Sequence, residues 1–103
     1  MSAAHTPGPW AVNAAFPNKV NGPDGRHVAT VGFGMSGKAR ANAALIAEAP
    51  AMLEALRDTT DELDAWLQAA IAQGEINARD RKTQEAKIER NRAILARIDG
   101  VAA

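Results

Sequence analysis

One glycine-rich stretch of the chain has the residue types that could bind a phosphate. Residues 32–39 read GFGMSGKA, which is one residue short of the loop G-x-x-x-x-G-K-[ST] and also fits G-x-G-x-x-G. In such a loop the glycines let backbone N–H groups converge on phosphate oxygens, the lysine reaches the terminal phosphates, and a Ser or Thr holds magnesium. Here Ala39 stands where the magnesium ligand belongs, and no strand is expected after Lys38. We therefore expect neither an NTPase nor a dinucleotide enzyme, and no other pattern identifies an enzyme.

Two interpretations of residues 32–39 remain open. The stretch can be a plain connector between a strand and a helix. It can also bind an anion without catalysis, because a glycine-rich loop and a helix N-terminus together present N–H groups and a positive dipole end. This second interpretation predicts a ligand-binding set of six residues: Phe33 to stack on a base, Asn42 to bond polar edges, and Arg26, Lys38, Arg40 and Arg57 to meet phosphates. Asn42 is alternatively a cap near the start of the helix.

The charge and composition of the 103-residue chain limit its chemistry. Its 12 basic and 12 acidic residues give a formal net charge of zero, whereas a general nucleic-acid binder usually carries a basic excess. A chain without cysteine has no disulfide and no thiolate metal site, and its two histidines are too few for an imidazole zinc site. We expect no metal and no cofactor. No segment resembles a secretory signal or a membrane span, so we expect a cytoplasmic protein without a membrane partner.

Turn-forming residues divide the one expected domain, residues 1–103, into two parts. Residues 1–38 hold four of the five prolines and six of the eight glycines, and are predicted to be rich in turns and short strands. Residues 39–103 are predicted to be helical. The chain is therefore expected to be α+β, with a small N-terminal antiparallel β-meander, a short helix and a C-terminal antiparallel helical hairpin.

The meander is predicted from short apolar runs separated by turn residues. The expected strands cover residues 10–12, 19–21 and 26–31, and the sequence GPDG at 22–25 has strong turn chemistry before the last of them. Alternation in that last strand puts His27, Ala29 and Val31 on one face. Trp10 is expected to be a core anchor that joins the meander to the helices.

The helical part is predicted from apolar residues at helical spacing. Expected helices cover residues 42–49, 51–73 and 75–98, with Pro50 ending, bending or opening a helix and Gly74 as the stop between the last two. The predicted seam of the hairpin is built from every-seventh residues and their offsets, namely Met52, Leu56, Thr59, Leu63, Trp66 and Ala70 on one helix and Ile88, Leu95 and Ile98 on the other. Trp66 is interpreted as a core residue or as a subunit contact.

Opposite charges on the two helices support the hairpin. Between Glu48 and Asp64 there are six acids and one base, and between Arg79 and Arg92 there are six bases and three acids. The basic run is interpreted as a solvated helix whose charges are paired with the acidic helix, the alternative being a phosphate-binding face. A short chain with a small core also favours a homo-oligomer.

Two sequence blocks resemble a widespread group of small bacteriophage and prophage proteins. The first block is TPGPW at residues 6–10, followed by the turn-and-strand sequence GPDGRHVA at 22–29, and the second is NAALIAEAPAMLEAL at 42–56. The likeness covers about residues 5–57, and Ala44 stands where Arg is common in that group. The resemblance implies a phage accessory protein in an infected or lysogenic bacterial host. In outline only, with N-terminal strands before two helices, the chain is also similar to the Thoeris anti-defence sponges that sequester nucleotide signals.

The resemblance and the glycine-rich stretch together give two functional hypotheses. The first is a counter-defence protein that binds and sequesters a small anionic ligand, a nucleotide immune signal, without acting as an enzyme. The second is a protein that inhibits a host defence complex, as anti-CRISPR proteins do, or acts as an assembly factor, through the exposed face of its helical hairpin at residues 75–92.

Overall fold

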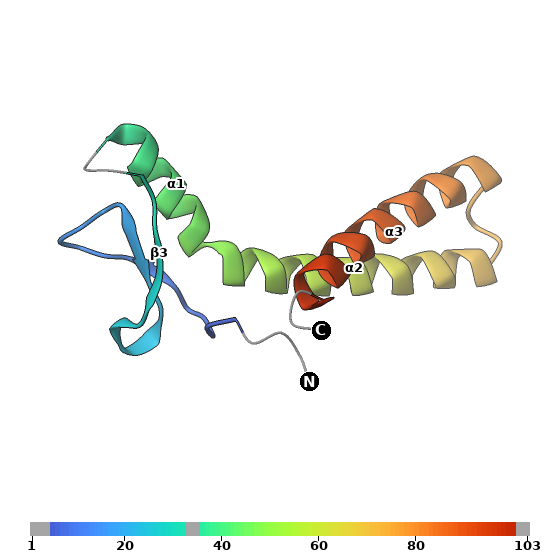
Figure 1. Ribbon diagram of the computed structural model, residues 1–103. Coiled ribbons are helices and arrows are strands. Elements are labelled where there is room, and N and C mark those ends of the chain that lie inside the picture. The colour runs from blue at the N-terminus through green and yellow to red at the C-terminus, as the bar shows by residue number, and fades with distance from the viewer. Residues whose placement is uncertain (1–4, 33–35, 101–103) are drawn as a thin grey trace. The chain divides into compact units, whose positions relative to one another are not determined.

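The structure is a computed structural model that describes residues 5–32 and 36–100, and it is α+β as expected (Figure 1). A three-stranded sheet precedes three helices. The elements in chain order are β1 (Ala11–Val12), β2 (Lys19–Asn21), the 3₁₀ turn η1 (Pro23–Gly25), β3 (His27–Thr30), α1 (Gly37–Ala47), α2 (Ala49–Ala72) and α3 (Ala78–Gly100).

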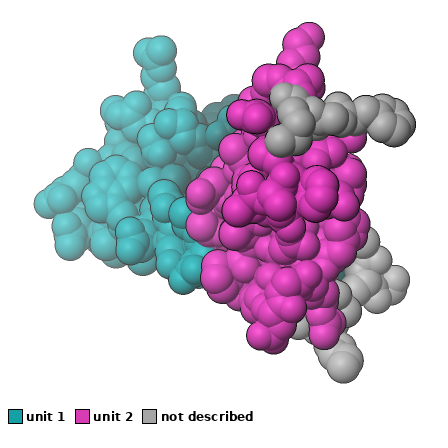
Figure 2. All heavy atoms as spheres, turned by 90° about the vertical axis from the view of Figure 1, so that its left-hand side faces the viewer, with its two compact units in different colours: residues 1–4, 54–103 teal, residues 5–53 magenta. Residues whose placement is uncertain are grey.

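The chain forms two compact units (Figure 2). One unit is residues 5–53, which hold the sheet, α1 and the start of α2, and the other holds the rest of α2 and α3. The boundary between the units therefore differs from the change of composition at residue 38, because α1 packs on β1 and β2.

The sheet is an antiparallel meander in the order β1-β2-β3, and a bulge interrupts its alternation. Val20 pairs with Ala29 but the next residue, Asn21, pairs with His27, so Val28 is an extra residue on β3. The expected face of His27, Ala29 and Val31 is therefore wrong, since His27 is exposed while the adjacent Val28 and Ala29 are both half-buried. His27 Nε2 lies 2.9 Å from Thr30 Oγ1, in hydrogen-bond contact at the exposed edge.

The first helix begins earlier than the sequence predicts. Ser36 is the N-cap of α1, and its Oγ accepts a hydrogen bond of 3.2 Å from the backbone N–H of Ala39. Asn42 lies inside the helix instead of near its start, so its predicted capping role is wrong. The hydroxyl of Ser36 satisfies an N–H that a helix start leaves free, and this favours a start at Gly37 despite the poor helix propensity of glycine.

The TPGPW segment contacts both α2 and Gly22, the residue just before the turn η1. A Cβ built on Gly8 would lie 2.8 Å from Pro50 Cβ, and one built on Gly22 would lie 2.7 Å from Thr6 Cγ2. Trp10 is half-buried, and its indole N–H donates to the carbonyl of Thr6 at 3.0 Å. The two sequence blocks of the phage resemblance therefore meet where the backbone of Gly8 lies against Pro50, the second residue of α2.

Replacing Gly8 by alanine should lower the free energy of unfolding by about 1–3 kcal/mol, the usual cost of overpacking a tight contact. The new methyl group would overlap the rigid ring of Pro50. Gly37→Ala is the matched control, because a Cβ there meets no atom within 4 Å and the position is helical. Urea unfolding of both variants checks this, and equal midpoints for Gly8→Ala and Gly37→Ala would contradict the contact.

The helical hairpin has a narrower seam than the sequence predicts. In α2, Leu67 and Thr60 are 0% and 1% exposed and Ala70 is buried, and in α3 the buried residues are Ile88 and Leu95. The predicted seam residues Leu56 and Leu63 are only half-buried. Met52, Thr59, Trp66 and Ile98 are exposed, so placing them in the seam is wrong. Gly74, with φ +69°, follows the last turn of α2 as expected.

A polar pair sits inside this apolar seam. The amide nitrogen of Asn91 donates to the buried hydroxyl of Thr60 at 3.2 Å, which links α3 to α2. A buried hydroxyl needs a partner, so the pair favours one register of the two helices over a slipped one.

Candidate functional site

Lys38, Arg40 and Asn42, three of the six predicted ligand residues, lie on α1, and all three are exposed. Lys38 and Asn42 share a face of the helix because they are four residues apart, but Arg40 is two residues from each and points elsewhere. The backbone N–H groups of Ala39 and Arg40 are already bonded to Ser36. Phe33 lies outside the described residues.

The two remaining predicted residues, Arg26 and Arg57, do not belong to α1. Arg26 directly precedes β3, so the length of that strand separates it from the end that leads to α1 (Figure 1). Arg57 belongs to the helical unit, where it forms an ion pair with Asp99. The hydrogen bond to the Asp99 carboxylate raises the pKa of Arg57 above its ordinary value. The structure therefore brings Lys38 and Asn42 together on one helix face, whereas Arg26 precedes the far end of β3 and Arg57 belongs to the other unit.

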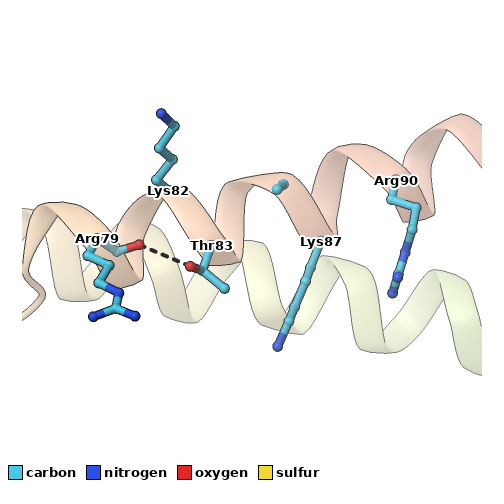
Figure 3. Close-up of a pocket in the computed structure, with 6 residues that line it drawn as sticks. Arg79, Lys82, Thr83, Lys87 and Arg90 are labelled. Carbon is cyan, nitrogen blue, oxygen red and sulfur yellow. Dashed lines mark hydrogen bonds between the residues drawn. The ribbon is translucent and has the colours of Figure 1, made fainter.

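A different cluster of cations lies on α3, and we call it the basic face. It consists of Arg79, Lys82, Thr83, Ala86, Lys87 and Arg90, which line a shallow hollow of about 570 Å³ (Figure 3). In Figure 3 the side chains of Arg79, Lys87 and Arg90 are directed to one side of the helix and that of Lys82 to the other. Thr83 is held in place by donating its hydroxyl proton to the carbonyl of Arg79 at 3.1 Å.

The spacing of these residues explains the hollow. They form two rows four residues apart, 79-83-87 and 82-86-90, and each row has a cation at both ends and a small uncharged residue between them. The long cationic side chains form the walls, and Thr83 and Ala86 form the floor. Such a surface offers four guanidinium or ammonium groups around a shallow, partly apolar centre.

The cations of the basic face have no acidic partner within 4 Å among the residues that the structure describes. Arg92 forms ion pairs with Asp61 and Asp64 of α2 at 3.3 and 3.0 Å. Arg81 forms an ion pair with Glu85 of α3 at 3.6 Å. Among the described residues, the predicted pairing of the basic run with the acidic helix is therefore confirmed for Arg92, whereas Arg81 pairs within α3 itself. In the sequence no acid stands four residues from Lys82, Lys87 or Arg90, and that signal could have found these three cations.

Other kinds of site find no support within residues 5–32 and 36–100. No three histidine or acidic side chains gather there in a way that could hold a metal ion. In the same part of the chain, no helix combines the length and apolar character needed to cross a membrane. Every buried polar side-chain atom in this part has a hydrogen-bond partner, so none points to a missing ligand.

Comparison with known proteins adds one relationship. The model of the family described as Salmonella phage P22 protein Y8K6 matches residues 1–102, nearly the whole chain. No curated protein and no solved structure shows significant similarity to the chain.

Proposed function

Because the chain belongs to this family of Salmonella phage P22 protein Y8K6, we propose that it is a phage accessory protein that binds an acidic surface of a host protein without catalysis. The observation that supports this most is the basic face of α3, whose four cations have no acidic partner in the described part of the chain. Unpaired cations on a helix give up no internal ion pair when they meet a carboxylate, and they steer an acidic partner into contact.

A folded protein fits the basic face better than a nucleic acid does. The face spans about 16 Å from Arg79 to Arg90 at the rise of an α-helix, and α2 of the same hairpin has five acids and one base. A polyanion longer than the face would be repelled by acidic side chains elsewhere on a chain whose net charge is zero. A local acidic patch on a protein is short enough to avoid them, and Thr83 and Ala86 leave room for an apolar side chain at its centre.

We propose counter-defence as the biological setting, with the protein acting in the cytoplasm of the infected host. Occupying the acidic surface of a defence protein would block what that surface normally binds. Such an inhibitor needs a rigid display of charge and no catalytic group, and a helix held by an apolar seam provides that display.

Site-directed photo-crosslinking tests whether the basic face touches a partner. A photoreactive amino acid is placed at Ala86, in the centre of the face, and in a control protein at Ala41, which is exposed on α1. Irradiated host cells should yield one protein adduct from position 86 and not from position 41. An adduct from position 41 alone, or no adduct from position 86, would contradict the proposal.

Sequestration of a nucleotide is the second candidate function. The observation that favours it is that α1 begins directly after the glycine-rich stretch, with Lys38 exposed in its first turn. Thermal unfolding with a panel of cyclic nucleotides and ADP-ribose derivatives tests it. A rise in the midpoint that disappears in Lys38→Ala/Arg40→Ala would support the sponge function, whereas flat curves across the panel would remove it.

A further inference from the structure

The helical hairpin leaves an apolar strip uncovered beside its seam. Trp66 of α2 is 56% exposed and Ile98 of α3 is 37% exposed, and they are the large apolar side chains most exposed among residues 54–100. Ile94 is half-buried beside Ile98. Burying an aromatic ring of this size is among the largest single contributions to an interface. We propose that a second copy of this chain covers the strip, so that two hairpins form a four-helix bundle.

The uncovered residues of the two helices lie on the same face of the hairpin. At about 100° per residue, Trp66 lies roughly a quarter turn around α2 from the seam formed by Thr60, Leu67 and Ala70. By the same count, Ile94 and Ile98 lie roughly 70–110° around α3 from its buried residues Ile88 and Leu95, displaced in the same helical sense. Because the two helices are antiparallel, displacement in the same sense brings both groups to one side. They share one side of the hairpin, where Ile98 lies more than two turns from Trp66 because its neighbour Asp99 pairs with Arg57. We call these three apolar residues the Trp66 strip.

Charges beside the strip are complementary to those of a second copy. On α2, Asp58 and Glu62 stand two turns and one turn before Trp66, and among the described residues neither has an ion pair. On α3, Lys87 stands two turns before Ile94 and has no acidic partner in the same residues. A two-fold axis parallel to the helices places α3 of the second copy over α2 of the first. Each acidic helix then lies beside a basic one, twice in the dimer.

The charges of the two helices therefore favour a two-fold axis parallel to the helices over an axis that runs across them. An axis across the helices would instead lay α2 on α2, with five acids and one base on each side, and like charges would repel. A partner of another sequence would need the same pattern of an apolar strip with acids on one edge and bases on the other. The chain itself has that pattern.

The Trp66 strip and most of the basic face can be occupied at the same time, because Lys87 is the one cation of the face that the proposed dimer covers. Lys82 lies on the side of α3 opposite Ile98, since the two are about 160° apart around the helix. Dimerisation leaves Lys82 and Ala86 exposed, and three of the four cations of the basic face in each copy remain for the host protein. Self-association does not depend on the proposed function, and it can be measured without the host partner.

Sedimentation equilibrium of the full-length chain tests the proposal. The wild-type chain should form a dimer of twice 10.8 kDa, and Trp66→Ala should raise the dissociation constant by about 30-fold or more, as expected for an aromatic hot spot. Phe16→Ala is the matched control, because Phe16 is 54% exposed on the other unit, and it should leave the dimer unchanged. Circular dichroism confirms that both variants keep their helices.

A charge swap tests the arrangement of the helices. Glu62→Lys and Lys87→Glu should each weaken the dimer, and the double variant should restore it, because the two charges face each other across the interface. A wild-type chain that stays monomeric at concentrations of about 100 μM would overturn the proposal. A dimer that survives Trp66→Ala, or a double variant weaker than either single one, would overturn it as well.

Discussion

Replacing Leu67 by alanine should lower the free energy of unfolding by about 2–5 kcal/mol, the range for deleting a buried leucine. Leu67 is 0% exposed and is the largest fully enclosed side chain of the chain's described residues. The other buried seam residues of α2 are Thr60 and Ala70, which are small and cannot move into the space it leaves. Since a domain of this length is usually stable by about 5–15 kcal/mol, the loss would be a large part of the total.

The neighbouring residue provides the control for this prediction. Gln68 is exposed on α2 and its side chain bonds to the exposed side of the same helix at Asp64, so Gln68→Ala should change the free energy of unfolding by less than about 0.5 kcal/mol. Denaturant unfolding followed by circular dichroism compares the two variants at equal protein concentration. A Leu67→Ala variant as stable as Gln68→Ala would mean that the seam does not pass through Leu67.

Reversing two charges on the basic face should weaken binding to the host protein by on the order of 100-fold. In Lys82→Glu/Arg90→Glu, each acid would face the acidic patch that the lysine or arginine contacted before. Both side chains are exposed and have no ion pair among the described residues, so the variant should fold as the wild type does. Raising the salt concentration should weaken the wild-type complex by the same physical cause.

A second double variant separates the basic face from the predicted ligand residues. Lys38→Glu/Arg40→Glu also exchanges one lysine and one arginine for acids, but on α1. The net charge changes equally in both variants, so a general effect of charge would weaken binding equally. We expect the α1 variant to bind within about 3-fold of the wild type, because its charges lie outside the proposed contact and act only at long range.

Local sequence signals were sufficient for most of the fold. The turn at GPDG needs left-handed residues, and Asp24 and Gly25 have φ of +63° and +72°. Gly74 ends α2, and the three strands and the hairpin were predicted from apolar runs between such turns. The bulge at Val28 could not be predicted, because it depends on how β3 pairs with β2 and leaves no mark in the sequence of β3 itself.

The seam of the hairpin was predicted less well than its helices. Periodicity identifies a wide apolar face on α2, but it does not say which part of that face α3 covers. The structure covers the part with Thr60 and Leu67 and leaves Trp66 exposed. A buried threonine is not an apolar signal, and its partner Asn91 comes from another helix, so neither could be identified from spacing alone.

The candidate site was predicted from a motif, and the structure directs attention elsewhere. Arg26 and Arg57 were predicted to join the ligand residues of the motif at 32–39 because they are cations. Their positions in the sequence do not indicate whether they lie near that motif in space. Whether a cation is free depends on tertiary pairing, which engages Arg57 with Asp99 and Arg92 with two acids. The cations of the basic face are those between residues 79 and 92 that form no ion pair among the described residues. From the sequence, a phosphate-binding face there was considered only as the alternative to a charge-paired helix.

The most direct test of the central claim is a calorimetric titration of the host protein identified by crosslinking. The account predicts a saturable complex with the wild-type chain, an affinity lower by on the order of 100-fold for Lys82→Glu/Arg90→Glu, and little change for Lys38→Glu/Arg40→Glu. Equal affinities for the wild type and the α3 variant, or a loss confined to the α1 variant, would contradict it.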